Sequence, residues 1–286
     1  MQPRDVRQVG VVGCGVMGSG IVEVVARARA EVVFIEETDD LVARGRAAVE
    51  RSVGRAVERG KLGNDDAISL LGRVRGATDL ESLAEADLVI EAATEDVDAK
   101  LKIFRTLGAR TRPEVVLASN TSSIPIVDLA VASGRPDRVV GMHFFNPPPV
   151  MALLELTPAL TTSEETLAFA RAFGSEVLGK TCVLAKDHAG FIVNRLLVPY
   201  LYDAVRLFDE EFATREDIDL AIHLGLAHPM GPLALMDLIG LDTMLNIGEV
   251  LHAEFRDERY APPPLLRRMV AAGMLGKKTG AGFYDY

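Results

Sequence analysis

The segment from Val9 to Glu36 restricts the possible folds more than any other part of the chain. Val9–Val12 is a short β-branched run, which is typical of a buried strand. A glycine-rich turn, Gly13–Gly18, follows it directly, and apolar residues then recur at helical spacing before a second strand-like run, Glu31–Ile35. A strand, a glycine turn, a helix and a second strand in this order predict a βαβ unit with parallel strands.

Gly13, Gly15 and Gly18 have the spacing of a dinucleotide-binding turn. In such a turn the first glycine permits the tight bend, the second lets a pyrophosphate approach the backbone, and the third allows close helix–strand packing. Glu36 ends the second strand, where a carboxylate accepts hydrogen bonds from an adenosine ribose and repels a 2′-phosphate. This favours NAD over NADP, with Glu37 as the neighbouring candidate. The alternative is a glycine turn in an α/β protein that binds another ligand.

Strands and helices are predicted to alternate as far as residue 185. The further strands expected are Asp87–Glu91, Val115–Ser119, Arg138–Met142, Leu153–Leu156 and Val183–Ala185, with helices at 39–60 and Lys100–Leu107. This alternation predicts an α/β domain with a doubly wound, mostly parallel sheet over residues 1–185. Residues 186–286 begin with a long apolar helix, Gly190–Asp209, kinked at Pro199, and show no strand pattern from Asp217 to Met274. They predict a second, all-helical domain.

The composition excludes several classes of protein. The chain has 31 basic and 41 acidic residues and a net charge of −10, which disfavours nucleic-acid binding because phosphates require a basic face. Two cysteines form no framework for disulfides, which fits a reducing cytoplasmic location, and no metal-ligand pattern is present. The N-terminus has no secretory pattern, and no apolar run is long enough to span a membrane.

His143 is the candidate for acid–base chemistry. It ends a predicted strand, and ligands bind at the carboxyl ends of such strands. Glu155 follows twelve residues later, after a proline turn, so a hairpin would bring the two side chains together. A histidine paired with a buried carboxylate is an oriented general base, which hydride transfer from an alcohol requires. The alternative is a histidine with a purely structural role in the core.

Three other sets of polar or charged residues can be explained by either a functional or a structural role. Ser119–Ser123 follows the fourth strand and either contacts substrate or caps a turn. Asn194 lies inside an apolar segment, and its amide either pairs with backbone or reaches a cleft. The segment from Arg44 to Arg75 has a charge of +4. Its arginine face, formed by Arg44, Arg51, Arg55 and Arg59 at helical spacing, either receives a polyanion such as CoA or is simply solvated.

The chain resembles the L-3-hydroxyacyl-CoA dehydrogenase family, and among its members the bacterial single-function 3-hydroxybutyryl-CoA dehydrogenases. Family motifs occur in order along nearly the whole chain, and together they are highly specific. They are Gly13–Gly20, Glu91–Glu95, Ser119–Ser123, Gly141–Pro147, Gly190–Arg195, His228–Pro232, Gly240–Asp242, Gly276–Gly280 and Gly282–Tyr284. Two positions depart from the family pattern, since Arg29 replaces a usual glycine and Ala152 a frequent lysine.

The resemblance implies a role for each matching residue. His143 matches the general base and Glu155 its carboxylate partner, whereas Ser122 and Asn194 match the groups that hold the reacting oxygen and the thioester. Ser52 and Arg59 match contacts to CoA. The implied cofactor-binding residues are Gly13, Gly15, Val16, Met17, Gly18, Glu36, Glu95, Lys100, Ser122, Asn146 and Lys278.

The function expected from this resemblance is NAD-dependent interconversion of short-chain L-3-hydroxyacyl-CoA and 3-ketoacyl-CoA, by a cytoplasmic homodimer associated through its helical domain. One alternative is the same chemistry on an acyl group tethered to a carrier protein. Another is a crystallin-like binding or structural protein that has lost turnover.

Overall fold

The chain forms two compact units, the first ending at Asp187 and the second beginning at His188. The structure is a computed structural model that describes residues 2–286. Each unit has its own hydrophobic core. None of the helices among the described residues is long and apolar enough to cross a membrane.

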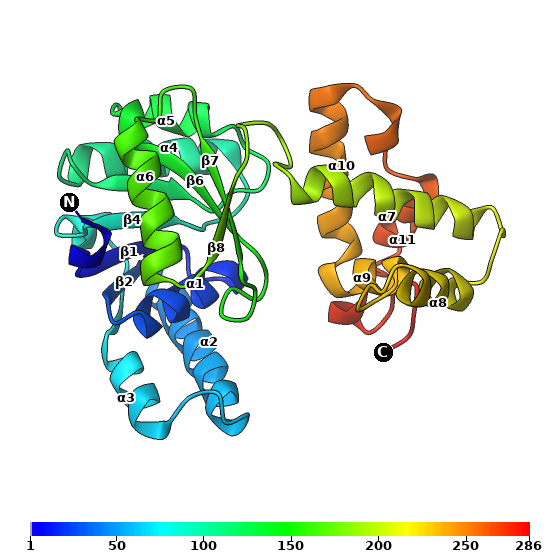
Figure 1. Cartoon of the computed structure of the whole chain (residues 1–286), viewed down its shortest axis with the longest axis horizontal. Coiled ribbons are helices and arrows are strands. Elements are labelled where there is room, and N and C mark those ends of the chain that lie inside the picture. The colour runs from blue at the N-terminus through cyan, green and yellow to red at the C-terminus, as the bar shows by residue number, and fades with distance from the viewer. Residues whose placement is uncertain (1) are drawn as a thin grey trace. The chain divides into compact units, whose positions relative to one another are not determined.

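The first unit is built on an eight-stranded sheet with the order β3-β2-β1-β4-β5-β6-β7-β8 (Figure 1). Its strands are β1 (Gln8–Val12), β2 (Glu31–Ile35), β3 (Val74–Ala77), β4 (Leu88–Glu91), β5 (Val116–Ser119), β6 (Val139–Phe144), β7 (Leu153–Pro158) and β8 (Thr181–Leu184). Neighbours pair in parallel except β6 and β7, which are antiparallel. This confirms the predicted mostly parallel, doubly wound sheet. Strand β3 is not among the strands predicted from the sequence, because Arg75 and Gly76 interrupt its apolar pattern.

Helices cover both faces of this sheet (Figure 1). They are α1 (Val16–Arg27), α2 (Asp39–Glu58), α3 (Asn64–Gly72), α4 (Val97–Arg110), α5 (Ile126–Ala132) and α6 (Glu164–Ala172). Apolar residues of α1, α2 and α6 form one core with alternate strand residues, among them Met142 and Phe144 of β6. A side chain added at Gly141 would meet Ile126 of α5, so α5 packs on the opposite face. Because successive residues of a strand point to opposite faces, His143 belongs to this α5 face.

The second unit is helical, as predicted. It contains α7 (Val193–Asp209), α8 (Arg215–Gly225), α9 (Pro232–Ile239), α10 (Leu241–Phe255) and α11 (Pro264–Ala271). Tyr202 of α7 is fully buried, and its hydroxyl donates to the Met244 carbonyl at 2.8 Å. The helix expected from Gly190 begins only at Val193, because Gly190 and Phe191 have φ angles of 74° and 45° that an α-helix does not allow.

Candidate active site

The glycine turn between β1 and α1 has the shape that a dinucleotide requires. Gly13 has φ +88°, and a Cβ there would lie 2.7 Å from the Cα of Ala93. A Cβ at Gly18 would lie 1.9 Å from the Gly13 carbonyl oxygen, so both positions admit only glycine. Gly15 instead faces open space at the N-terminus of α1, where no side chain caps the helix. This open cradle at a helix N-terminus fits the pyrophosphate of NAD.

Glu36 follows β2 directly and lies beside the glycine turn. Its Oε1 accepts a hydrogen bond of 2.5 Å from the backbone N–H of Cys14. The carboxylate predicted to hold the adenosine ribose therefore also anchors the turn that holds the phosphates. Burial and the nearby Glu36 charge raise the pKa of the Cys14 thiol to about 12, so this cysteine is not a nucleophile at neutral pH.

The β6–β7 hairpin brings the expected acid–base pair together. His143 and Glu155 are direct partners in the antiparallel register, and His143 Nδ1 lies 2.8 Å from Glu155 Oε2. Glu155 is fully buried and His143 is 7% exposed. An ionised Glu155 accepts from Nδ1–H, which assigns the proton-accepting role to Nε2. The pair is therefore an oriented base near the carboxyl end of β6.

The polar segment Ser119–Ser123 leaves the carboxyl end of β5, which is the parallel neighbour of β6. The Asn120 Oδ1 accepts from the backbone N–H of Phe144 at 2.8 Å, so this segment lies directly against the strand of His143. Glu95 Oε1 accepts hydrogen bonds from the Thr121 hydroxyl, the Ser122 N–H and the Ser123 hydroxyl. The structure thus places the Glu95 carboxylate in contact with the backbone of Ser122.

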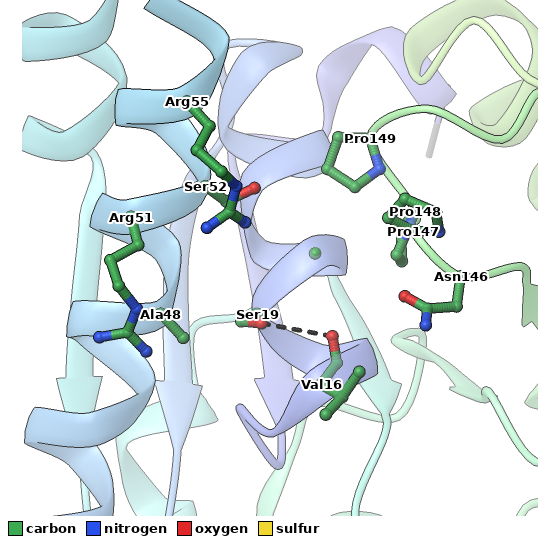
Figure 2. A pocket seen from close by; sticks show the side chains of 11 residues that line it. Val16, Ser19, Ala48, Arg51, Ser52, Arg55, Asn146, Pro147, Pro148 and Pro149 are labelled. Atoms are coloured by element: carbon green, nitrogen blue, oxygen red, sulfur yellow. Dashed lines mark hydrogen bonds between the residues drawn. The ribbon is translucent and has the colours of Figure 1, made fainter. Parts of the chain in front are cut away.

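A pocket of about 260 Å³ lies between α1, α2 and the proline segment after β6. Its polar lining residues include Ser52, Arg51 and Arg55 of α2 and Asn146. Figure 2 shows the guanidinium of Arg55 and the hydroxyl of Ser52 extending from α2 toward the prolines. Arg59 is exposed at the C-cap of α2, one turn beyond Arg55. Arg51 and Arg55 of the arginine face therefore line this cavity, which suits an anionic ligand, whereas Arg59 is not among its lining residues.

The remaining expected residues have different environments. Val16 is 76% exposed and Met17 is partly exposed at the start of α1, whereas Lys100 is only 1% exposed. In the second unit Asn194 is buried near the start of α7, and the Lys278 ammonium contacts both carboxylate oxygens of Asp242 at 2.5 and 2.6 Å.

Glu91 and Asn120 were not predicted as individual residues of the site. Glu91 is a buried acid at the end of a strand, and Asn120 joins two neighbouring strand ends. Two signals in the sequence point to Glu91: it begins one of the family motifs, Glu91–Glu95, and it is a charged residue that ends an apolar strand.

A nucleotide-binding turn and a carboxylate-oriented histidine occur at the same edge of one sheet, and together they define this protein as an NAD-dependent dehydrogenase. The family model for the 3-hydroxyacyl-CoA dehydrogenase NAD-binding domain matches residues 8–188, and that for the C-terminal domain of the same family matches residues 190–286. The chain belongs to the 3-hydroxyacyl-CoA dehydrogenase family, and it is an oxidoreductase that uses NAD.

Individual relatives agree with this assignment over the whole chain. A 3-hydroxybutyryl-CoA dehydrogenase from Mycobacterium tuberculosis is 51% identical over 282 residues, which cover 98% of this chain and 99% of the relative. The crystal structure of M. tuberculosis FadB2 has a TM-score of 0.97 at 50% identity and covers 98% of this chain and 99% of its own. The (S)-3-hydroxybutyryl-CoA dehydrogenase PaaH1 from Ralstonia eutropha has a TM-score of 0.93 at 47% identity, covering 99% of both chains.

Proposed function

We propose that this enzyme interconverts L-3-hydroxybutyryl-CoA and acetoacetyl-CoA, with NAD as the hydride acceptor in the oxidative direction. The observation that carries the proposal is the buried His143–Glu155 pair at the carboxyl edge of the sheet, beside Ser119–Ser123. The names of the relatives with 47–51% identity support the short acyl chain.

The residues of this chain perform the proton transfer. Nε2 of His143 accepts the proton of the C3 hydroxyl as the C3–H bond breaks, and bound NAD supplies the hydride acceptor. The negative charge of Glu155 stabilises the imidazolium that forms, and its bond to Nδ1 keeps the ring in place. General base catalysis of this kind contributes roughly 10²–10⁴-fold to the rate.

The cofactor is held by the glycine turn and by the carboxylates of Glu36 and Glu95. The open face of Gly15 receives the pyrophosphate, and Glu36 binds the adenosine ribose. Asn146 and Lys278 are proposed to complete the NAD contacts, as the family resemblance implies.

The substrate is held by groups on α2 and beside the histidine. Ser122 donates a hydrogen bond to the reacting oxygen, and Asn194 of the second unit holds the thioester. Ser52 and Arg59 bind the CoA phosphates. The cavity that Ser52 and Arg55 line supports this part of the proposal, because it suits an anionic group of the substrate.

The test is NAD-dependent oxidation of L-3-hydroxybutyryl-CoA, compared in wild type, His143→Ala and a control variant, His252→Ala, at a partly exposed histidine of α10. We expect kcat to fall by about 10²–10⁴-fold in His143→Ala alone, with the Kd for NADH nearly unchanged. Turnover of His143→Ala at the rate of the control would contradict the proposed base.

Two substrates separate the alternatives in the same assay. Faster turnover of the acyl-carrier-protein thioester than of the CoA thioester would assign the activity to a tethered acyl group. Absence of turnover with either substrate, despite tight NADH binding, would favour a non-catalytic binding protein.

We also propose that the enzyme is a cytoplasmic homodimer that associates through its helical unit. Several large apolar side chains of that unit are well exposed, including Leu196 at 70%, Phe212 at 77% and Leu224 at 69%. Exposed apolar surface of this kind is typical of an interface between subunits. Sedimentation equilibrium checks the proposal, which predicts twice the mass of the 30.8 kDa chain.

A further inference from the structure

A buried ion pair lies behind the segment that carries Ser122. Glu91, the last residue of β4, is fully buried, and Lys100 of α4 is 1% exposed. Lys100 Nζ lies 2.5 Å from Glu91 Oε1. Removing two charges from water is costly, and the cost is recovered only where further hydrogen bonds satisfy both groups.

The ammonium group of Lys100 has three partners within the protein. Besides Glu91 Oε1, these are the Ala93 carbonyl oxygen at 3.3 Å and Glu95 Oε2 at 3.4 Å. Glu91 and Ala93 accept hydrogen bonds from the ammonium group, whereas Glu95 forms an ion pair with it. Lys100 thus connects two carboxylates, one fully buried and the other, Glu95, 41% exposed.

Both carboxylates hold the segment after β5. Glu91 Oε2 accepts from the Ser119 hydroxyl at 2.6 Å, and the Glu91 carbonyl accepts from the Asn120 N–H at 2.7 Å. Glu95 Oε1 accepts from Thr121 and Ser123 hydroxyls and from the Ser122 N–H at 3.1 Å. The segment is thus attached at each of its five residues, and Asn120 extends the attachment to the strand of His143.

We propose that Glu91 and Lys100 are positioning residues, which hold Glu95 and the 119–123 segment so that Ser122 is presented to the reacting oxygen beside His143. Lys100 acts on this segment through Glu95. The proposal rests on the proposed function for the role of Ser122, whereas the attachment of the segment is a property of the protein without substrate. Misplacing a reacting group by about 1 Å lowers a rate by on the order of 10²-fold, so such an attachment affects kcat.

The first measurement is amide hydrogen exchange of the peptide covering residues 119–124 in the protein without cofactor. The variant is the neutral pair Glu91→Gln/Lys100→Met, which leaves no uncompensated buried charge. The control is Lys102→Met, which removes the same charge from an exposed position of α4. We expect exchange in this peptide to rise about tenfold or more in the neutral pair and to stay unchanged in the control, with β1 unaffected in both.

Ser119→Ala provides a second variant if the neutral pair does not fold. It keeps the Glu91–Lys100 pair and removes only one bond between Glu91 and the segment. A smaller rise in exchange of the same peptide is expected. A folded variant that keeps wild-type exchange in residues 119–124 would overturn the proposal.

The second measurement is a double-variant cycle on the Kd for NADH, obtained by fluorescence titration. If Lys100 acts through Glu95, Lys100→Met changes this Kd by less than about twofold once Glu95→Gln is present, because the two effects are coupled. A further tenfold loss of affinity in that background would make Lys100 a direct ligand and contradict the proposal.

Measurements of turnover show whether a failure lies in the positioning role of the ion pair or in the proposed function. We expect kcat for acetoacetyl-CoA to fall about tenfold or more in the neutral pair and to stay at the wild-type value in Lys102→Met. A wild-type protein without turnover would refute the proposed function, and the exchange and NADH measurements would still decide whether the ion pair positions the segment. Faster hydrogen exchange in residues 119–124 with an unchanged kcat would refute the role of the ion pair in catalysis.

Discussion

At the scale of single residues, Glu95 shows how a neighbouring positive charge and hydrogen bonds together outweigh burial. Burial alone would raise the pKa of the Glu95 carboxyl, but the charge of Lys100 and hydrogen bonds from Thr121, Ser123 and Ser122 hold it below the ordinary value of 4.5. Glu95 is therefore ionised at every pH at which the enzyme is expected to work. An acceptor with fixed charge is thus available at the edge of the proposed cofactor site.

This lowered pKa predicts how Glu95 affects stability as pH changes. A carboxyl whose pKa is lower in the folded state stabilises the fold fully above its unfolded pKa and loses this contribution as pH falls through the folded pKa. The difference in Tm between wild type and Glu95→Gln should therefore be constant from about pH 8 to pH 6 and shrink below about pH 4.5. Thermal unfolding followed by circular dichroism checks this, and a difference that grows with acidification would contradict it.

Arg29 adopts a backbone conformation that costs free energy for any residue with a side chain. It lies between α1 and β2 with φ 70°, in the left-handed region that favours glycine, which explains why glycine is usual at this position in the family. Left-handed backbone costs a residue with a side chain about 1–2 kcal/mol, partly offset by the greater unfolded-state entropy of glycine.

Arg29→Gly should therefore raise the free energy of unfolding by up to about 1 kcal/mol. The control, Arg44→Gly, changes an exposed arginine to glycine inside helix α2 and should lower it by about 1 kcal/mol. Urea denaturation of both variants provides the measurement. Destabilisation by Arg29→Gly would show that its side chain contributes more than its backbone conformation costs.

At the scale of elements, the packing of α7 against α10 depends on one glycine. A Cβ at Gly248 of α10 would lie 1.8 Å from the hydroxyl oxygen of Tyr202 and 2.6 Å from its Cζ. Tyr202 is buried and hydrogen-bonded to Met244, so the ring has little freedom to move. The close approach of the two helices is therefore possible only without a side chain at residue 248.

Gly248→Ala is expected to destabilise the second unit by about 1–3 kcal/mol, because overpacking forces rotamer and backbone shifts. Combining it with Tyr202→Phe, which removes the oxygen at the point of closest approach, should recover part of this loss relative to Tyr202→Phe alone. Gly225→Ala is the control, since a Cβ at the end of α8 meets nothing within 4 Å. Chemical denaturation followed by tyrosine fluorescence measures all four variants, and additive losses would argue against the contact.

At the scale of the whole molecule, charge is distributed unevenly along the chain. The segment Arg44–Arg75 contains eight basic and four acidic residues, a charge of +4, so the rest of the chain carries −14 to reach the total of −10. This segment includes most of α2, whose Ser52 and Arg55 line the cavity. An otherwise acidic protein thus presents a local attraction for a phosphate-bearing substrate.

Arg59→Ala should raise the KM for acetoacetyl-CoA by about two- to fivefold with little change in kcat, because an exposed ion pair contributes up to about 1 kcal/mol and lies far from C3. The effect should disappear with a pantetheine thioester and weaken with added salt. Arg105→Ala, at an exposed position of α4, is the control. Steady-state kinetics at two ionic strengths tests this prediction. An equal rise in KM with the pantetheine thioester would indicate a folding defect instead.

The sequence by itself determined the βαβ unit, the glycine turn and Glu36, since these depend on the spacing of neighbouring residues along one strand, turn and helix. The same local patterns predicted a helical second unit. Local spacing missed the edge strand β3, whose apolar pattern is weak, and it placed the start of α7 three residues too early, because the positive φ of Phe191 has no signal in its residue type.

The tertiary structure decided which side chains meet. The hairpin register pairs His143 with Glu155, and sheet order places β4 beside β5 so that Glu91 reaches Ser119 across 28 residues. Lys100 became a buried link between two carboxylates only when α4 packed onto the sheet. These contacts join residues from different elements, and their geometry follows from strand order and packing, which no single stretch of sequence contains.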